Sequence, residues 1–257
     1  MIYCNVKGGL GNIMFQIAAA TSFAKDLQTT ASFPNLLSVI SDSTYYKNSA
    51  EEVYEFLGNL NTAKPSSVYE TINYPFHYEK KNLTLNCCVD GFFQSEKYFK
   101  KHRIDILELF QYSDYTKKII DKYSNILAKK TVSLHIRRGD YLRLTNHHPV
   151  LPFDYYKSAL SKIGNYDNLL IFSDDIEWCK QSFTDSNATF VIEKDYVSLL
   201  LMSKCHANII ANSSFSWWGA WLNTNDGSQV IRPNNHFGPN LSHLDTKDIY
   251  PPNWIKN

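Results

Sequence analysis

Hydrophobic and polar positions follow a regular pattern in the second half of the chain. Short apolar runs, which are typical of buried strands, alternate there with longer stretches that have helical spacing. We expect strands at 132–136, 168–173, 189–193, 207–211 and 229–232, and helices at 152–163, 176–182, 197–205 and 214–223. Strands that alternate with helices predict an α/β fold with a parallel sheet covered on both faces, as in nucleotide-binding domains.

The first half of the chain has a clear pattern only at its start. An apolar segment at 2–7 predicts a strand, and the turn Gly8-Gly-Leu-Gly-Asn12 leads into an alanine-rich helix from about 13 to 27. Residues 34–80 are rich in Ser, Asn, Tyr and Pro and predict loops and short helices. Three further elements are expected: a strand or hairpin at 82–93, and helices at 96–110 and 115–127.

The length of 257 residues suits two compact domains. We place the joint at Ala128-Lys-Lys130, just before the regular pattern begins. This gives an N-terminal α/β domain, residues 1–128, which contains the glycine-rich turn. The C-terminal α/β domain, residues 129–257, is then the one expected to bind a nucleotide.

Composition narrows the function classes. A formal net charge of +1, with 44% hydrophobic and 20% charged residues, excludes a disordered chain and argues against a nucleic-acid partner. Any site for an anion must therefore be confined to a small part of the surface and cannot be a broad basic face. The sequence shows no signal-like start and no apolar run of about 18 residues, and its five cysteines are odd in number and lack C-x-x-C spacing. We expect a cytoplasmic protein without an integral membrane segment.

Two arginines stand directly after the strand at 132–136. Ligands of an open α/β sheet bind beyond the carboxyl ends of its strands, and guanidinium groups suit phosphate or carboxylate groups. Arg137 and Arg138 therefore predict an anionic substrate. The alternative is structural, because either arginine could pair with Asp140 and brace the turn.

The same strand has two different sides. Val132, Leu134 and Ile136 point to one side of the sheet, which we expect to be core. Ser133 and His135 point to the other side, which we expect to be polar. His135 is interpreted as a hydrogen-bonded structural residue rather than a base or a ligand.

Two carboxylates end the next strand. Asp174 and Asp175 could hold a divalent metal beside a diphosphate, or accept hydrogen bonds from a ribose or a base. Capping of the following helix explains them nearly as well. The metal is the weakest of these interpretations, because no third ligand cluster is evident and two arginines already supply positive charge.

A polar run opens the last expected helix. Asn212, Ser213 and Ser214 are good N-cap residues, and a helix N-terminus with hydroxyl groups can bind an anion such as a diphosphate. Capping alone would also explain them. The glycines Gly9 and Gly11 lack the spacing of known phosphate loops, but they would let the backbone approach a ligand closely.

Four segments together resemble the α-1,2-fucosyltransferases of glycosyltransferase family 11. They are Gly8-Gly-Leu-Gly-Asn-Ile-Met-Phe-Gln16, His135-Ile-Arg-Arg-Gly-Asp-Tyr141, Phe172-Ser-Asp-Asp175 and Asn212-Ser-Ser-Phe-Ser-Trp-Trp-Gly-Ala-Trp221. They occur in the family's order at compatible spacing, and the resemblance covers nearly the whole chain. One departure is Ile13, where the family usually has Gln.

The resemblance implies a GT-B fold, in which two Rossmann-like domains face each other across a cleft. It also implies an inverting transfer of L-fucose from GDP-β-L-fucose to the 2-hydroxyl of a galactose-terminated glycan, without a metal or another cofactor. A surface polysaccharide or oligosaccharide is the expected acceptor, with peripheral contact to membrane-linked glycan.

The resemblance also assigns roles. Arg137 and Arg138 match the pair that grips the GDP diphosphate, and Asp140 orients them. Ser213 and Ser214, next to Asn212, match the hydroxyl groups at the phosphates. Asp174 and Asp175 lie near the guanosine or frame the loop. Asn12, a catalytic candidate together with Arg138 and Asp140, faces the donor from the opposite domain with Gly9 and Gly11.

The general base is left open among Asp140, Asp154 and His148, with Asp140 preferred. A purely structural pairing of Asp140 with the arginines explains it equally well. Two other functions also remain open: another GDP-sugar transferase on the same scaffold, and a noncatalytic nucleotide-sugar-binding module.

Overall fold

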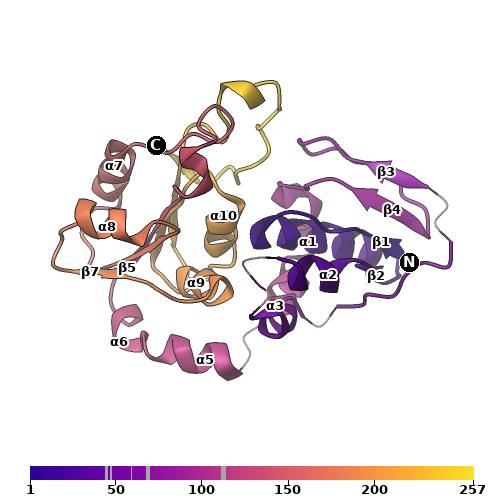
Figure 1. Ribbon diagram of the computed structural model, residues 1–257, viewed down its shortest axis with the longest axis horizontal. Helices are drawn as coiled ribbons and strands as arrows, with labels where there is room; N and C mark the ends of the chain where they lie inside the picture. The colour runs from indigo at the N-terminus through magenta and orange to yellow at the C-terminus, as the bar shows by residue number, and fades with distance from the viewer. Residues whose placement is uncertain (44–45, 47, 59, 68–69, 111–113) are drawn as a thin grey trace. The chain divides into compact units, whose positions relative to one another are not determined.

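The structure is a computed structural model that describes residues 1–43, 46, 48–58, 60–67, 70–110 and 114–257. The chain forms two compact units, each built on a parallel β-sheet (Figure 1). Unit 1 contains Met1–Ser113 and Asp245–Pro251, and unit 2 contains Asp114–Leu244 and Pro252–Asn257. The expected α/β class with parallel sheets is confirmed.

Unit 2 has a six-stranded sheet with the strand order β10-β9-β8-β5-β6-β7, and all neighbouring strands are parallel. The strands are β5 (Thr131–Ile136), β6 (Asn168–Ser173), β7 (Ala188–Phe190), β8 (Ala207–Ile209), β9 (Gln229–Arg232) and β10 (Ile255–Lys256). All five expected strands are present. The sequence missed β10, because a strand of two residues carries no readable period.

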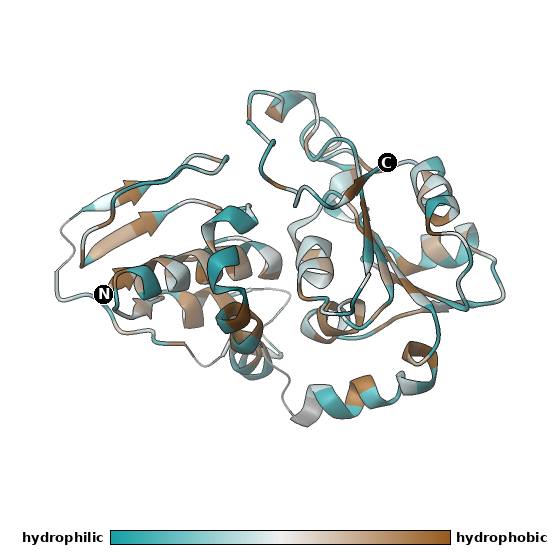
Figure 2. Ribbon diagram, turned by 180° about the vertical axis from the view of Figure 1, so that it is seen from behind, coloured by the Kyte–Doolittle hydropathy of each residue, from teal (hydrophilic) through white to brown (hydrophobic). Residues whose placement is uncertain are grey.

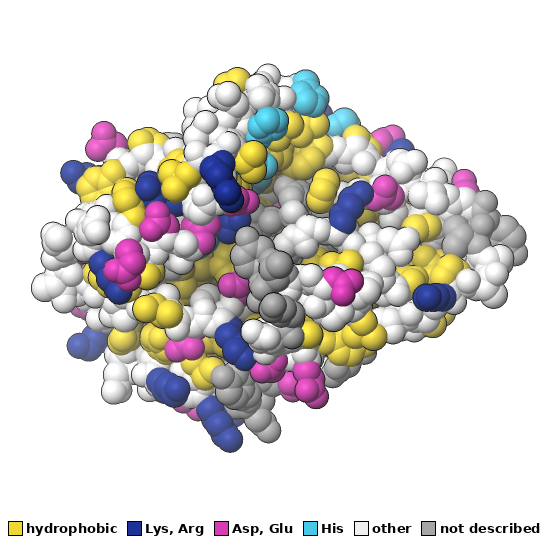
Figure 3. All heavy atoms as spheres, viewed as in Figure 1, with side chains coloured by type: hydrophobic (Ala, Val, Ile, Leu, Met, Phe, Trp, Pro, Cys, Tyr) yellow, Lys and Arg dark blue, Asp and Glu magenta, His cyan; other side chains and the backbone are white. Residues whose placement is uncertain are grey.

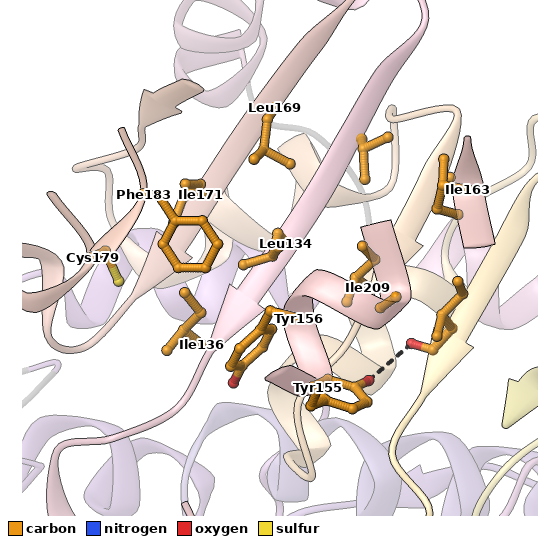
Figure 4. Close-up of a cluster of buried hydrophobic side chains, with 14 residues drawn as sticks. Leu134, Ile136, Tyr155, Tyr156, Ile163, Leu169, Ile171, Cys179, Phe183 and Ile209 are labelled. Carbon is orange, nitrogen blue, oxygen red and sulfur yellow. Dashed lines mark hydrogen bonds between the residues drawn. The ribbon is translucent and has the colours of Figure 1, made fainter. Parts of the chain in front are cut away.

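Helices cover both faces of this sheet, as the alternating pattern predicts. They are α7 (Phe153–Ile163), α8 (Ile176–Ser182), α9 (Asp195–Met202) and α10 (Ser214–Trp221). Leu134 and Ile136 pack with Tyr156 of α7 and Cys179 of α8 in the main core cluster (Figure 4). In Figure 2 the hydrophobic colour follows the strands of this sheet.

The expected polar side of β5 is also buried, which corrects the prediction of one core face and one polar face. All six residues of β5 are buried. On this side Asn208 donates to the Ser133 hydroxyl at 2.6 Å and to the Met202 carbonyl at the end of α9, and His135 lies against Phe215 of α10. Ser133 and His135 are therefore covered by helices, as is usual for the central strand of a doubly covered sheet.

The boundary between the units lies before α5 (Asp114–Asp121) and α6 (Ser124–Leu127), whereas the expected joint lay after them. The α6 end is tied to the sheet of unit 2, because the Ile126 carbonyl accepts hydrogen bonds from Thr131 Oγ1 at 2.5 Å and from Asn168 Nδ2 at 3.2 Å. The basic stretch at 128–130 is thus a turn within unit 2.

Unit 1 has a four-stranded parallel sheet with the order β2-β1-β4-β3. Its strands are β1 (Ile2–Tyr3), β2 (Ala31–Ser32), β3 (Thr71–Asn73) and β4 (Cys87–Asp90), and its helices are α1 (Leu10–Asp26), α2 (Leu36–Ser41), α3 (Ala50–Phe56) and α4 (Arg103–Leu109). The expected strand at 2–7 is thus only two residues long. The expected helix at 96–110 consists of two 3₁₀ turns, η1 (Glu96–Tyr98) and η2 (Lys100–His102), followed by α4.

The first helix begins three residues earlier than expected. Gly9 is its N-cap residue with an extended backbone, and the Gly9 carbonyl accepts from the amides of Asn12 and Ile13. Leu10 and Ile13 are both buried. The glycine turn is therefore shorter than the motif suggests, and Gly11 and Asn12 belong to the first turn of α1.

The segment Asp245–Pro251 returns to unit 1 after the chain has built most of unit 2. Asp248, which is only 8% exposed, accepts from the Tyr78 amide at 3.3 Å and forms an ion pair with Lys97. This carboxylate therefore fastens the late segment to unit 1. Among the described residues, no helix is both long and apolar enough for a membrane span.

Candidate functional site

The candidate site of unit 2 lies at the carboxyl ends of three adjacent strands. The chain leaves β5 at Arg137, β6 at Asp174 and β8 through the loop to Ser213. Since β8, β5 and β6 are neighbours in the sheet, these three loops emerge along one edge. Ligands of open α/β sheets bind at this edge.

Arg137 is held by two carboxylates. Its Nη2 donates to Asp140 Oδ1 at 2.7 Å, and its Nη1 lies 3.1 Å from Asp174 Oδ2. Burial alone would lower the pKa of Arg137, but Asp174 and Asp140 outweigh it and raise the pKa. The structural alternative, in which an arginine braces the turn through Asp140, is therefore realised by Arg137.

Arg138 is held differently. Its Nε donates to Asp175 Oδ2 at 2.9 Å, and its guanidinium lies 4.0 Å from the centre of the Trp178 ring. Its two Nη atoms make no hydrogen bond to any described residue. A stacked guanidinium that is fixed at Nε and open at both Nη atoms is suited to grip a phosphate with two parallel hydrogen bonds.

Asp174 and Asp175 set the shape of the loop after β5 that carries Arg137 and Arg138, which we call the arginine loop. Asp174 Oδ1 accepts from the Arg138 amide at 2.8 Å, and Asp175 caps α8 by accepting from the Trp178 amide at 3.3 Å. A Cβ on Gly139 would stand 2.5 Å from Asp174 Oδ2, so this turn requires glycine. Both alternatives to a metal site, capping and framing of the loop, are present in the structure.

The carboxylates of the candidate site contact arginines. The described ranges contain no group of three or more His, Cys, Asp or Glu side chains placed to hold a metal ion. Asp140, Asp174 and Asp175 each direct an oxygen at an arginine instead.

The polar run after β8 has divided roles. Ser213 caps α10 by accepting from the Phe215 amide at 3.3 Å, and the Ser214 hydroxyl has no hydrogen-bond partner among the described residues. Asn212 is fully buried, and its Nδ2 donates to the carbonyls of Pro149 and His236. Asn212 thus ties two loops to the start of α10, while its role in donor binding stays a prediction.

His135 does not make the hydrogen bond expected of it. It is 5% exposed, and its Nδ1 has no partner among the described residues. Burial, with a smaller effect of Arg137, lowers its pKa to about 3. His135 is therefore neutral at physiological pH and keeps a buried ring nitrogen unused.

The three base candidates differ in their surroundings. Asp140 is partly exposed, and one of its oxygens faces Arg137. Asp154 is exposed in the first turn of α7. His148 stacks on the Tyr141 ring with the centroids 4.8 Å apart. Asp140 thus contacts one of the two arginines, and its role in orienting the pair stays a prediction.

Unit 1 has an amide pair and the glycine turn after its two central strands, next to the Lys7–Asp90 ion pair. Asn12 Oδ1 accepts from Gln94 Nε2 at 2.6 Å. Gln16 closes the glycine turn, because its side chain accepts from the Lys7 amide at 3.1 Å and donates to the Lys7 and Asn12 carbonyls at 2.8 Å. The approach of Gly9, Gly11 and Asn12 to the donor stays a prediction.

Sequence reasoning missed Trp178 and Gln94 as site residues. Trp178 lies three residues after the N-cap Asp175, a spacing that points its ring back toward the cap, so a signal was present in the sequence. Gln94 contacts a residue 82 positions away, and no local pattern indicates such a pair.

Charged side chains are dispersed on the visible face of the molecule (Figure 3). On the face shown in Figure 3, basic and acidic side chains of the described residues are interspersed and form no continuous basic patch. This agrees with the net charge of +1 and with an anion site confined to the arginine loop.

The sequence matches the family described as Glycosyl transferase family 11 over residues 1–257. It is 30% identical to the O-antigen biosynthesis glycosyltransferase WbnK of Escherichia coli, in an alignment 311 positions long, gaps included, that covers 99% of each chain. It is 29% identical to the alpha-1,2-colitosyltransferase of Escherichia coli, covering 100% of this chain and 98% of that protein. A galactoside 2-alpha-L-fucosyltransferase of Caenorhabditis elegans is 24% identical, covering 100% of this chain and 79% of that protein.

Two solved fucosyltransferases share the fold. The fucosyltransferase NodZ from Bradyrhizobium matches with a TM-score of 0.51 at 10% identity, covering 85% of this chain and 92% of that one. POFUT1 in complex with GDP-fucose matches with a TM-score of 0.50 at 13% identity, covering 89% and 96%. The expected GT-B type of the fold is confirmed by these likenesses.

Proposed function

Because the chain belongs to glycosyltransferase family 11, we propose that it transfers L-fucose from GDP-β-L-fucose to the 2-hydroxyl of a galactose-terminated glycan, with inversion to an α-linkage. The reaction class, a glycosyltransferase, is shown by the family and its relatives. The choice of donor rests on relatives named as fucosyltransferases, and the 2-hydroxyl rests on the galactoside 2-alpha-L-fucosyltransferase.

The observation that carries the proposal is the open guanidinium of Arg138. Transfer breaks the bond between the sugar anomeric carbon and the β-phosphate oxygen, and the electron pair leaves with GDP. Positive charge develops on the sugar and negative charge on the diphosphate, so fixed donors at the leaving group stabilise the transition state. Arg138 is anchored at Nε and stacked on Trp178, which leaves its Nη atoms for this charge.

Arg137 and α10 supplement Arg138 in this proposal. Arg137 contributes positive charge and, through Asp174 and Asp140, sets the shape of the loop. The N-terminal amides of α10 and the unpartnered hydroxyl of Ser214 offer further hydrogen bonds to the phosphates. No broad basic surface is needed for this arrangement.

The acceptor hydroxyl must lose a proton as its oxygen bonds to the anomeric carbon. We assign the proton to Asp140, whose Oδ1 faces Arg137 while its Oδ2 makes no hydrogen bond to any described residue. In an advanced, oxocarbenium-like transition state the hydroxyl becomes acidic late. The contribution of Asp140 as a base is therefore expected to be smaller than that of Arg138.

The proposed reaction needs no divalent metal. The arginine loop supplies the positive charge that a metal would bring to the diphosphate, and the nearby carboxylates face arginines. Retention of full activity in EDTA is the expected result.

A second donor is favoured by one observation. A relative of nearly equal similarity is named an alpha-1,2-colitosyltransferase. Colitose differs from fucose only by lacking the 3-hydroxyl, so the same diphosphate contacts would serve either donor. The two donors are told apart by testing each of them with the same acceptors.

The decisive experiment incubates the protein with GDP-fucose, or with GDP-colitose, and a panel of galactose-terminated oligosaccharides in the presence of EDTA. GDP release and product mass are followed together. A product heavier by one fucose, with an α-1,2 linkage by NMR, supports the proposal. Transfer from GDP-colitose alone contradicts the donor assignment, and activity restored only by added manganese contradicts the metal-independent reaction.

A further inference from the structure

His148 contacts the surroundings of the candidate site through Tyr141, and the proposed function leaves it without a role. Its ring stacks on Tyr141 at a centroid distance of 4.8 Å and an interplanar angle of 17°. The guanidinium of Arg137 lies over the same tyrosine ring at 5.2 Å. One aromatic ring thus connects the imidazole to the arginine that braces the candidate diphosphate site.

The position of His148 is fixed from two sides. Tyr141 donates its hydroxyl to the Asn212 carbonyl at 3.0 Å, and Asn212 donates its amide to the Pro149 carbonyl at 3.0 Å. The stacking partner of His148 and the residue that follows it are therefore both anchored to one buried residue. A group held in this way is preorganised, because little ordering is needed when a ligand arrives.

A second loop supports the first. The Gly238 amide donates to the His147 carbonyl at 2.8 Å, and the Asn240 amide donates to the Asn146 carbonyl at 2.9 Å. A Cβ on Gly238 would stand 2.5 Å from the Asn146 carbonyl oxygen, so the two backbones are in close contact. Phe237 of this loop also packs on the His148 ring at 5.5 Å.

The two nitrogens of His148 have different surroundings. Nδ1 is buried and has no hydrogen-bond partner among the described residues. The residue as a whole is partly exposed, so the exposed edge of the ring carries Nε2. A buried N–H without an acceptor is costly and rare, whereas an N–H at the surface always finds one. The proton of the neutral ring therefore belongs on Nε2.

This tautomer makes His148 a hydrogen-bond donor and not a base. A general base would need its lone pair at Nε2, which would place the proton on Nδ1 where no acceptor is found. Burial lowers the pKa of His148, with Asp140 acting in the opposite direction, so the ring is neutral at physiological pH. His148 is thus the least suitable of the three base candidates.

We propose that Nε2–H of His148 donates a hydrogen bond to a hydroxyl oxygen of a sugar ring bound beside the arginine loop. This inference rests on the proposed glycosyltransfer. A neutral single donor suits a hydroxyl group better than a phosphate, which the open fork of Arg138 serves better. Apolar side chains, Leu142 and Leu144, are 50% and 42% exposed in the same loop and suit the C–H face of a sugar.

The sugar has two possible sources, the donor fucose and the acceptor galactose, and kinetics distinguish them. His148→Phe keeps an aromatic ring on Tyr141 and removes the Nε2 donor, so folding is expected to be retained. His148→Gln returns an N–H donor without the ring. His147→Phe is the matched control, because His147 is an exposed histidine of the same loop that makes no ring contact with a described residue.

The expected result for His148→Phe is a rise of about three- to tenfold in one KM. GDP affinity by calorimetry should be unchanged, because GDP contains neither the fucose nor the galactose that His148 is proposed to contact. A rise in the acceptor KM assigns the contact to galactose, and a rise in the GDP-fucose KM, with slower donor hydrolysis when no acceptor is present, assigns it to fucose. His148→Gln should recover part of the loss, and His147→Phe should behave as wild type.

Two results would overturn the inference. If both KM values of His148→Phe stay within twofold of wild type, the ring is only a stacking element. If kcat instead falls a hundredfold and the acidic limb of the pH profile disappears, His148 is a base. The proposed function is tested by wild-type turnover, so its failure would be seen before any variant is compared.

Discussion

The two units place polar groups at the same end of a parallel sheet but use different chemistry there. In unit 2, Arg137 and Arg138 meet three aspartates after the central strands. In unit 1, the corresponding ends carry the glycine turn and the Asn12–Gln94 amide pair, with one exposed ion pair between Lys7 and Asp90. A charged, internally paired edge is suited to a diphosphate, and a neutral edge with glycines is suited to close approach by uncharged groups.

The largest expected difference between the units appears in acid. Burial lowers the pKa values of His135 and His236 to about 3, and both residues belong to unit 2. The unfolded chain takes up these protons near pH 6.5 while the folded chain does not, so stability falls as the pH drops below about 6.5 and down toward 3. Between pH 7 and pH 5 the loss is roughly 2 kcal/mol for each histidine.

Tryptophan fluorescence measures this loss in unit 2 alone, because Trp178, Trp217, Trp218, Trp221 and Trp254 all lie there. Denaturant midpoints at pH 7 and pH 5 give the change, and replacement of the exposed His243 by Gln is the control. An unfolding free energy that is the same at both pH values would contradict the burial of two neutral histidines.

Replacing Arg138 tests the charged edge directly. Arg138→Ala should cost at least ~3 kcal/mol in the transition state, on the scale of one lost oxyanion donor. Arg138→Lys should also fail, since an ammonium group cannot form the two parallel hydrogen bonds of a guanidinium. Steady-state kcat/KM with GDP-fucose measures both, and activity within a few-fold of wild type would refute the assignment.

Gly139→Ala should disturb the same edge without removing a charge. The new Cβ would stand 2.5 Å from Asp174 Oδ2, so the carboxylate must leave the Arg138 amide or the Arg137 guanidinium. A charge-assisted hydrogen bond of this kind is worth about 2 kcal/mol, so we expect roughly a thirtyfold loss of kcat/KM. Unchanged kinetics in a folded variant would show that Asp174 does not set the geometry of the loop.

Gly9→Ser tests the neutral edge of unit 1. Gly9 has an extended backbone with no atom within 4 Å of a new Cβ, and serine is a good N-cap residue, so stability should not fall. A ligand that approaches the backbone would meet the added side chain, so we expect about a tenfold loss of activity. Gly8→Ser is the contrasting variant, because Gly8 has φ +88° and a Cβ there would stand 2.8 Å from Asn12 Nδ2. Full activity of Gly9→Ser would remove Gly9 from the donor site.

The smallest effect is expected at the exposed Lys7–Asp90 ion pair of unit 1. Lys7 and Asp90 are both nearly half exposed, and such pairs contribute less than about 1 kcal/mol. Asp90→Asn should lower the melting temperature slightly at low salt and not at all in high salt. A larger loss that persists in salt would mean that unit 1 also depends on its charges.

The sequence predicted unit 2 well because its elements are long enough to show a period. β5 and β6 have six residues each, and α7 has eleven. β1 and β2 of unit 1 have two residues each, so their alternation cannot be read, and they are strands only because neighbouring chain segments pair with them. The break of 96–110 into short turns likewise depends on tertiary packing.

In the candidate site, too, some contacts could be predicted from the sequence and others could not. The Arg137–Asp140 pair is local and was foreseen as an alternative. The Arg138–Asp175 pair spans 37 residues, but both residues follow predicted parallel strands, so their meeting at one edge could be inferred. Two other contacts depend on packing between loops, which no sequence pattern describes. They are the stacking of His148 on Tyr141 and the hydrogen bond from Asn212 to the Pro149 carbonyl.

The late return of residues 245–251 to unit 1 bears on how the chain folds while it is being synthesised. Domains generally form in the order in which they leave the ribosome. Tyr78 and Lys97 leave early, yet the carboxylate that they share, Asp248, arrives only after nearly all of unit 2 has been made. Unit 1 therefore cannot be completed first. A nascent chain halted before residue 245 would have an N-terminal unit that lacks the Asp248 contacts with Tyr78 and Lys97.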